Sequence, residues 1–276
     1  MRKRVIINSD DFGLTEGVNN GIIELIEAGV LTSTSVMTNM PHYRDIIPYK
    51  DKIGVGIHLT LTEGMPVLNP TKIPTLVNEN GFFYKYSVVT KKAIYRKFSS
   101  QELVDEFSAQ VQKLIDIGIK PSHIDSHESI LKYPFFIPIV RKLALKYNIK
   151  GIRTYSLRRF DLKRLLNPKR TLISIILLLQ KRMWKNEGFH VTDKIDSLNK
   201  FGLNYREASD KLKSIMDDLP DGVLEIVVHP GYCNEDNTPL GGYVSEREAE
   251  LQALLSEEFK KTIQNSGVSL INYNDI

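Results

Sequence analysis

Segments with the pattern of β-strands alternate with segments with the pattern of α-helices along most of this chain. The first strand is expected at residues 5–7, and the first helix at 18–26, ending near Gly29. Strands that alternate with helices are typical of parallel β/α units, and 276 residues suit one α/β barrel. We therefore predict a single β/α-barrel domain over residues 1–276. Further strands are expected at 32–37, 53–60, 123–127, 151–155, 222–230 and 268–273, and further helices at 99–117, 138–147, 208–219 and 245–264.

Two stretches do not follow this alternation. Residues 82–98 look irregular, and residues 156–200 are expected to form an insertion that serves as a lid, a dimer surface or a substrate wall. Between Lys150 and Lys185 there are eleven Lys or Arg residues and one acid, Asp161. Such a run is typical of a solvated face, although it also suits an anionic ligand or a membrane surface. The net charge of +4 is mild, so we expect no nucleic-acid partner.

Cysteine usage and hydropathy indicate the compartment. Cys233 is the one cysteine, which excludes an internal disulfide and a cysteine-based metal cluster, and we interpret it as an inert thiol. The basic N-terminus is followed by an apolar run at 5–7 that is too short for a signal peptide. The longest apolar patch, 172–179, is far shorter than the roughly 20 residues of a membrane span. We predict a cytoplasmic protein without a membrane partner.

The first predicted strand ends in two adjacent carboxylates, Asp10 and Asp11, followed by Phe12 and Gly13. Like charges repel, and ionised Asp is rarely tolerated beside a core strand unless something neutralises it. Because successive side chains of a strand point in different directions, one carboxylate could hold a cation while its neighbour faces a substrate. The alternative is an Asp-rich turn that caps the following helix.

Three of the six histidines, His58, His127 and His229, also lie where predicted strands end. In a β/α barrel these ends form one rim, where active sites are built. Two imidazoles and one carboxylate with open positions suit Zn²⁺, Mn²⁺, Fe²⁺ or Co²⁺, and Mg²⁺ less well. Such an ion activates water, and Asp10 and His229 can supply the base and the acid that hydrolysis needs. His58 could instead be a core histidine with its hydrogen bonds satisfied, and His127 could instead hydrogen-bond a helix terminus.

Other polar residues are given supporting roles. His123 and Asp125 lie on the same strand face as His127, so we expect them behind the metal ligands, where carboxylates orient imidazoles. Arg153 is expected to bind substrate or to pair with one of the Asp residues. The remaining histidines, His42 and His190, are assigned to the surface.

Five motifs follow one another along the chain: NSDDFGL at 8–14, GVLTSTS at 29–35, GIHLTLTEG at 56–64, PSHIDSH at 121–127 and HPGY at 229–232. Together they resemble the YdjC-like carbohydrate deacetylase family, which includes chitooligosaccharide deacetylases. The resemblance runs from about residue 4 to residue 240 and so covers most of the chain. After the fourth motif the family usually continues with further histidines, whereas this chain continues with 128–131, Glu-Ser-Ile-Leu.

This resemblance implies a β/α barrel related to polysaccharide deacetylases and one divalent metal, Mg²⁺ or Zn²⁺. It implies Asp11, His58 and His127 as the metal ligands, Asp10 as the base and His229 as the acid. The implied reaction removes the acetyl group from an N-acetylated amino sugar, such as N-acetylglucosamine or a chitooligosaccharide. Homodimers are common among such proteins, so the resemblance also suggests a homodimer.

Two other functions remain open from the residues alone. A metal-dependent phosphoesterase would use the same ligands to hold a phosphate, and the basic segment would attract an anion. A non-catalytic sugar-binding barrel would keep the rim without turnover. Glycoside hydrolysis by the Asp pair is disfavoured, because adjacent residues cannot easily lie on both sides of a glycosidic bond.

Overall fold

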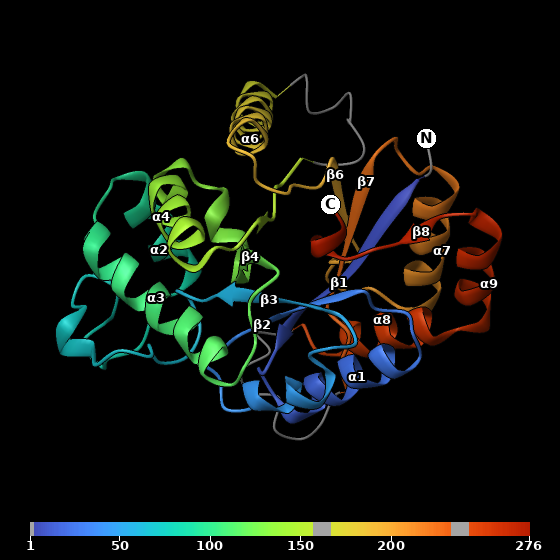
Figure 1. Ribbon diagram of the computed structural model, residues 1–276, viewed down its shortest axis with the longest axis horizontal. Coiled ribbons are helices and arrows are strands. Elements are labelled where there is room, and N and C mark those ends of the chain that lie inside the picture. The colour runs from blue at the N-terminus through green and yellow to red at the C-terminus, as the bar shows by residue number, and fades with distance from the viewer. Residues whose placement is uncertain (1–2, 157–166, 233–242) are drawn as a thin grey trace.

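The centre of the molecule is a curled parallel sheet surrounded by helices (Figure 1). The computed structural model describes residues 3–156, 167–232 and 243–276. The strands follow the order β5-β4-β3-β2-β1-β7-β6, and β8 also pairs with β1. Every strand pair is parallel, so the carboxyl ends of the strands meet at one rim. The strands are β1 Arg4–Phe12, β2 Ser33–Val36, β3 Gly54–Leu59, β4 His123–Ser126, β5 Gly151–Ile152, β6 Lys194–Ser197, β7 Val223–Val228 and β8 Ser269–Leu270.

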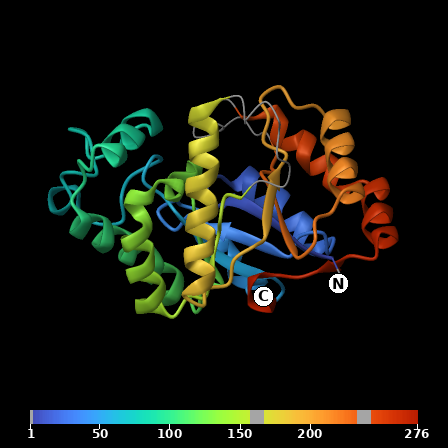
Figure 2. The same ribbon diagram turned by 90° about the horizontal axis from the view of Figure 1, so that it is seen from above.

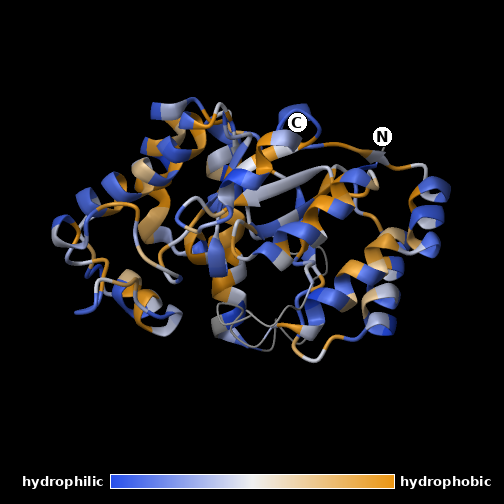
Figure 3. Cartoon of the chain, turned by 90° about the horizontal axis from the view of Figure 1, so that it is seen from below, coloured by the Kyte–Doolittle hydropathy of each residue, from blue (hydrophilic) through white to orange (hydrophobic). Residues whose placement is uncertain are grey.

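The helices lie outside this sheet, and several of them, such as α1 and α3, pack apolar side chains against it. In Figure 3 the hydrophobic colour gathers on the helix sides that face the sheet, and the hydrophilic colour on the outer sides. The helix α3, for example, buries Leu103, Phe107 and Leu114, which recur at helical spacing. The α-helices in the described residues are α1 Glu16–Glu27, α2 Tyr86–Ile94, α3 Ser100–Asp116, α4 Ile137–Tyr147, α6 Pro168–Asn186, α7 Tyr205–Asp217, α8 Ser245–Leu255 and α9 Glu257–Ser266.

The two edges of the curled sheet approach each other. Gly151 of β5 forms a parallel bridge with His190, and Ile195 of β6 donates its amide hydrogen to the carbonyl of Ser156 at 2.9 Å. The sheet is therefore a half-barrel whose edges are linked by these few bonds. The predicted α/β class, a β/α barrel, is confirmed, in the form of this half-barrel.

Three details differ from the sequence expectation. The predicted helix 245–264 is two helices, because Ser256 adopts an extended conformation and its hydroxyl accepts from the amide of Phe259 as an N-cap. The stretch 82–98 contains the helix α2. Within 156–200, the described residues contain α6 and also β6, which pairs with β7 and so belongs to the main sheet.

Helix α6 stands beside the sheet, next to α4 (Figure 2). Its inner side buries Trp184 and Gln180, while its outer side exposes Leu172, Ile175 and Leu179. Among the helices of the described ranges, none combines the length and apolarity that a membrane crossing needs.

Candidate metal centre

The carboxyl-end rim of the sheet contains a cavity of about 460 Å³. This volume lies in the range of small-molecule sites, about 300–1,000 Å³. The strand ends β1, β3, β4 and β7 each contribute at least one polar side chain, although these segments are far apart in sequence. The sequence predicted that its strand-end residues would meet, and the structure brings them to this cavity. The predicted residues that line it are Asp10, Asp11, His58, His127, Arg153 and His229.

Asp11, His58 and His127 form the group that suits a metal ion. One nitrogen or oxygen from each lies within 4.8 Å of the others. His127 Nδ1 is 2.9 Å from Asp11 Oδ1, and His58 Nε2 is 3.4 Å from the same oxygen. Asp11 and His58 are buried, whereas the His127 side chain is 18% exposed, so the group opens toward the cavity.

The surroundings of His58 indicate that its Nε2 atom faces a cation. His58 and Asp125 are register partners on β3 and β4, and Nδ1 lies 2.8 Å from Asp125 Oδ1. Because a carboxylate accepts hydrogen bonds, Nδ1 carries the proton of the neutral ring, and Nε2 of that form presents its lone pair. Nε2 is buried and has no hydrogen-bond partner among the described residues. A divalent ion bound by Nε2 would satisfy this atom, so the residues present fit a metal.

The pKa values of this group follow from crowded charges. Burial lowers the pKa of His58, but Asp125 and Asp10 outweigh burial and raise it to about 10. Burial raises the pKa of the Asp11 carboxyl, but His127 and Arg247 hold it well below its usual range. Both shifts show that the site favours a positive charge between His58 and Asp11, which a proton or a metal ion can supply.

The end of β1 is distorted where it presents the two carboxylates. The register with β2 shifts between Ser9 and Phe12, and Asp11 has a φ of 68°, in the left-handed region that residues other than glycine rarely adopt. The expected alternation would point Asp10 and Asp11 in different directions. In the structure both carboxylates line the same cavity, because the irregularity re-aims the chain. Backbone strain of this kind is typical of functional sites.

Asp10 is held by Arg153, whose guanidinium donates to both Asp10 oxygens at 2.7 Å. The same guanidinium reaches Asp125 at 2.8 Å and Glu225 at 2.9 Å. A second candidate ligand group, Asp10, His58 and Asp125, is therefore already occupied by an arginine cation. This favours the first group for a metal ion. Arg153 also lines the cavity, and its predicted substrate-binding role stays a prediction.

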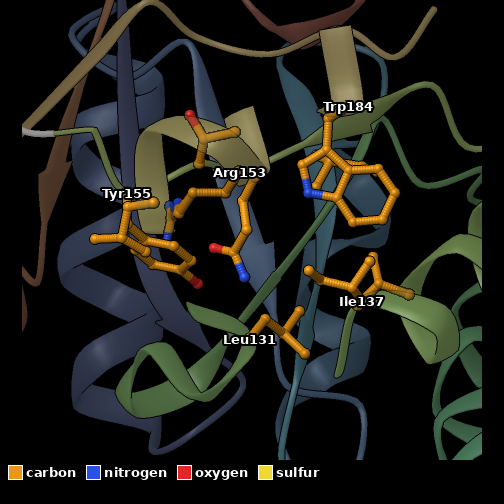
Figure 4. Close-up of a pocket in the computed structure, with 10 residues that line it drawn as sticks. Leu131, Ile137, Arg153, Tyr155 and Trp184 are labelled. Carbon is orange, nitrogen blue, oxygen red and sulfur yellow. The ribbon is translucent and has the colours of Figure 1, made fainter. Parts of the chain in front are cut away.

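Helix α6 covers the side of Arg153 that faces away from the metal ligands. Figure 4 shows Trp184, Ile137 and Leu131 around a small cavity that also contacts Arg153 and Tyr155. This cavity measures about 20 Å³, room for about one water molecule. The apolar packing excludes bulk water from the guanidinium, which strengthens its hydrogen bonds to the carboxylates.

His229 follows the end of β7, the strand that pairs with β1. Its Nε2 atom is 3.9 Å from Asp10 Oδ2, and its backbone amide donates to buried Glu250 at 2.7 Å. The ring packs edge-on against Tyr243, whose hydroxyl also donates to Glu250, at 2.6 Å. These contacts fix the position of the imidazole beside the cavity.

Arg247 is a site residue that the sequence analysis missed. Its guanidinium donates to Asp11 Oδ2 at 2.6 Å, and it lines the cavity from α8. A signal was present: Arg247 and Glu250 share one helix face with Leu251 and Leu254, and charged residues on an apolar face require buried partners. Glu225, which binds Arg153, was missed because it lies in the middle of the strand β7.

The remaining sequence candidates lie around this centre. His123 is fully buried, stacks on Tyr273 at 4.1 Å and lies 3.0 Å from the hydroxyl of Ser35, which donates to Asp125. Asp125 thus contacts His58 directly and is linked to His123 through Ser35, and the supporting role of both residues stays a prediction. His42 is partly exposed, and His190 Nδ1 donates to the carbonyl of Tyr273 at 3.2 Å. Cys233 lies outside the described residues.

Comparison with known proteins gives the family. The sequence model of the YdjC-like protein family matches residues 4–265, nearly the whole chain. The chain belongs to the YdjC-like protein family. The YdjC-like resemblance predicted from the five motifs is thereby confirmed. The matched range includes every residue of the candidate metal group.

Curated relatives extend over the same length. A protein of Thermoanaerobacter pseudethanolicus is 30% identical over 278 residues, covering 99% of this chain and 98% of the relative. One of Halalkalibacterium halodurans is 33% identical over 263 residues, covering 91% and 94%. Both relatives are named carbohydrate deacetylase. Solved structures of similar fold include an Enterococcus faecalis protein provisionally assigned to cellobiose-phosphate cleavage, with a TM-score of 0.80, 26% identity, and 100% and 99% of the two chains covered. A Streptococcus mutans CE4 esterase, at 12% identity and a TM-score of 0.53 over 98% and 86%, shares the fold.

Proposed function

We propose that this YdjC-like protein is a metal-dependent carbohydrate deacetylase that hydrolyses the acetamide of N-acetylated amino sugars. The observation that carries the proposal is the Asp11, His58 and His127 group, with Asp10 and His229 beside it in one cavity. The names of the curated relatives support the substrate class. The proposed products are acetate and a free amino sugar.

The donor atoms of the three ligands favour one kind of metal ion over another. Two imidazole nitrogens and one carboxylate oxygen suit Zn²⁺, whereas Mg²⁺ prefers oxygen ligands. A divalent cation held by Asp11, His58 and His127 would supply Lewis acidity toward the acetamide carbonyl. Asp125 would keep His58 in the tautomer that binds through Nε2, since it faces Nδ1 at 2.8 Å.

Asp10 is proposed as the general base. Arg153 and the side-chain amide of Asn8 fix its carboxylate, the amide donating to Oδ1 at 2.9 Å. These hydrogen bonds hold the carboxylate at the cavity, where it would take a proton from the attacking water. Arg153 is a positioning residue in this proposal, because its donors are directed at carboxylates. Water is excluded from its far side by α6.

His229 is proposed as the general acid. Its Nε2 atom lies 3.9 Å from Asp10 Oδ2, and His229 lines the same cavity as the metal ligands. A protonated imidazole at this position would donate its proton to the departing amine. The leaving sugar would therefore lie on the His229 side of the cavity, and the acetyl group on the side of Asp11 and His58.

Two substitutions separate the metal role from the base role. Asp10→Asn should remove most acetate release, by about 10²-fold or more, and leave the metal bound. His58→Ala should lose the metal itself, because it deletes a ligand. We would measure acetate release from N-acetylglucosamine and its oligomers, and the bound metal by elemental analysis. Undiminished acetate release in Asp10→Asn would reject Asp10 as the base.

A parallel assay tests the phosphoesterase alternative. The metal-loaded protein is incubated with N-acetylated sugars and with phosphomonoesters, and acetate and phosphate are measured. Acetate release alone supports the proposal, and phosphate release without acetate would overturn it. Sugar binding without any release, with Zn²⁺ or Mg²⁺ present, would favour a non-catalytic barrel.

A further inference from the structure

A large aromatic side chain is exposed at the mouth of the cavity. Phe201 lies on the loop between β6 and α7, is 71% exposed, and is one of the residues that line the cavity. Another exposed aromatic residue nearby, Tyr205, is 44% exposed but does not line this cavity. Phe201 therefore presents an apolar ring to whatever enters the site.

The loop that carries Phe201 is anchored on both sides of the ring. Leu198 and Leu203 are buried, at 2% and 5% exposure. The amide of Gly202 donates to Glu246 Oε1 at 2.7 Å, and Gly202 has a φ of 74°, which glycine adopts without strain. The backbone on either side is fixed, so the outward position of Phe201 is built into the loop.

Phe201 is the outermost of three rings that run from the reacting centre to solvent. Its centroid is 5.8 Å from that of Tyr243, and Tyr243 lies 6.0 Å from the ring of His229. Exposure rises along the row, since Tyr243 is 8% exposed and Phe201 71%. The row thus extends away from His229, on the side where the leaving sugar would lie.

We propose that Phe201 is the stacking platform of an outer subsite, which holds the sugar ring next to the one that is deacetylated. This inference rests on the proposed deacetylase function. A pyranose ring has an apolar C–H face that fits an aromatic ring, and hydroxyl groups at its edge. Ser197 and Asn199 line the same cavity beside Phe201 and offer donors and acceptors for those hydroxyls. A sugar ring whose acetamide is held at the metal would lie beside His229, at the inner end of the three aromatic rings. Phe201, at their outer end, would then contact the next sugar ring of the substrate.

The test compares two sugars on matched variants of the metal-loaded protein. The probes are N-acetylglucosamine and its β-1,4-linked disaccharide, and calorimetry gives the Kd of each while acetate release gives KM and kcat. Phe201→Ala should weaken binding of the disaccharide about five- to tenfold and raise its KM, with kcat unchanged. Binding of the monosaccharide should not change. Phe201→Tyr keeps a ring face and should behave like the wild type.

Tyr205→Ala is the matched control, because it removes an exposed aromatic ring close in sequence that does not line the cavity. It should leave both sugars unaffected. Equal changes for the two sugars in Phe201→Ala, or no change for either, would overturn the subsite. A further outcome separates the two proposals: Phe201→Ala weakens binding of the disaccharide alone, but the wild-type protein releases no acetate. This outcome would support the subsite and reject the deacetylase function.

Discussion

Single side chains in this protein have very different energetic weight, depending on burial. Arg153 contacts Asp10, Asp125 and Glu225, and all four side chains are buried. Removing one partner of a buried ionic cluster leaves the other charges uncompensated, which destabilises a protein by roughly 3–5 kcal/mol. A surface ion pair contributes about 0–1 kcal/mol, since water already solvates both charges. This chain contains an arginine in a buried ionic cluster, Arg153, and an arginine in a surface ion pair, Arg141.

Arg153→Met should therefore lower the free energy of unfolding by about 3–5 kcal/mol. Arg141→Met is the matched control, because Arg141 pairs with Glu187 at 2.6 Å on the surface, with side chains 37% and 33% exposed. The control should lower the free energy of unfolding by about 1 kcal/mol or less. Urea unfolding of the two variants measures both values. Equal losses would contradict the ionic cluster around Arg153.

Neighbouring strands approach closely where the site is built. Gly56 of β3 lies beneath the ring of His123 on β4, and a Cβ atom at Gly56 would lie 2.2 Å from His123 Cε1. Real Cβ atoms do not come this close, so the ring or the strand would have to move. Glycine at position 56 therefore leaves the space that the His123 ring fills.

Gly56→Ala should consequently destabilise the protein by about 1–3 kcal/mol through overpacking. A double-mutant cycle identifies the cause, because His123→Ala removes the ring that the new methyl group would meet. In the His123→Ala background, Gly56→Ala should have little additional effect on the free energy of unfolding. Additive losses would show that the Gly56 effect does not arise from His123.

The charge balance of the whole site makes the stability of the metal-free protein depend on pH. Burial lowers the pKa of His123 to about 4, while Asp125 and Asp10 raise the pKa of His58 to about 10 against the effect of burial. Both start from an ordinary value of 6.5. A raised pKa adds stability that is complete below 6.5 and is lost as pH rises toward 10. A lowered histidine pKa adds stability that is present above 6.5 and is lost as pH falls toward 4.

The metal-free protein should accordingly be most stable near pH 6.5. Below that pH, His123 alone should lower the free energy of unfolding by about 3 kcal/mol by pH 4. Urea unfolding at pH 4.5, 6.5 and 9 measures the curve. Adding a divalent metal should remove the decline on the alkaline side, because the ion displaces the His58 proton. His123→Asn should flatten the acid side, and an unchanged acid side would contradict the burial of a neutral His123.

The sequence alone determined which side chains reach the rim. Asp10, Asp11, His58, His127 and His229 each lie where a predicted strand ends, and parallel strands place all such ends on one edge. These signals are local, so they can be read along the chain. The fold class followed from the same alternation of strand and helix patterns.

The tertiary structure decided what each rim residue contacts. Arg247 binds Asp11 from 236 positions away, and Glu225 and Arg153 meet only because the sheet curls. The shifted register that turns both carboxylates into one cavity is also a consequence of strand pairing. Contacts between distant segments depend on register and packing, which no local pattern of the sequence encodes.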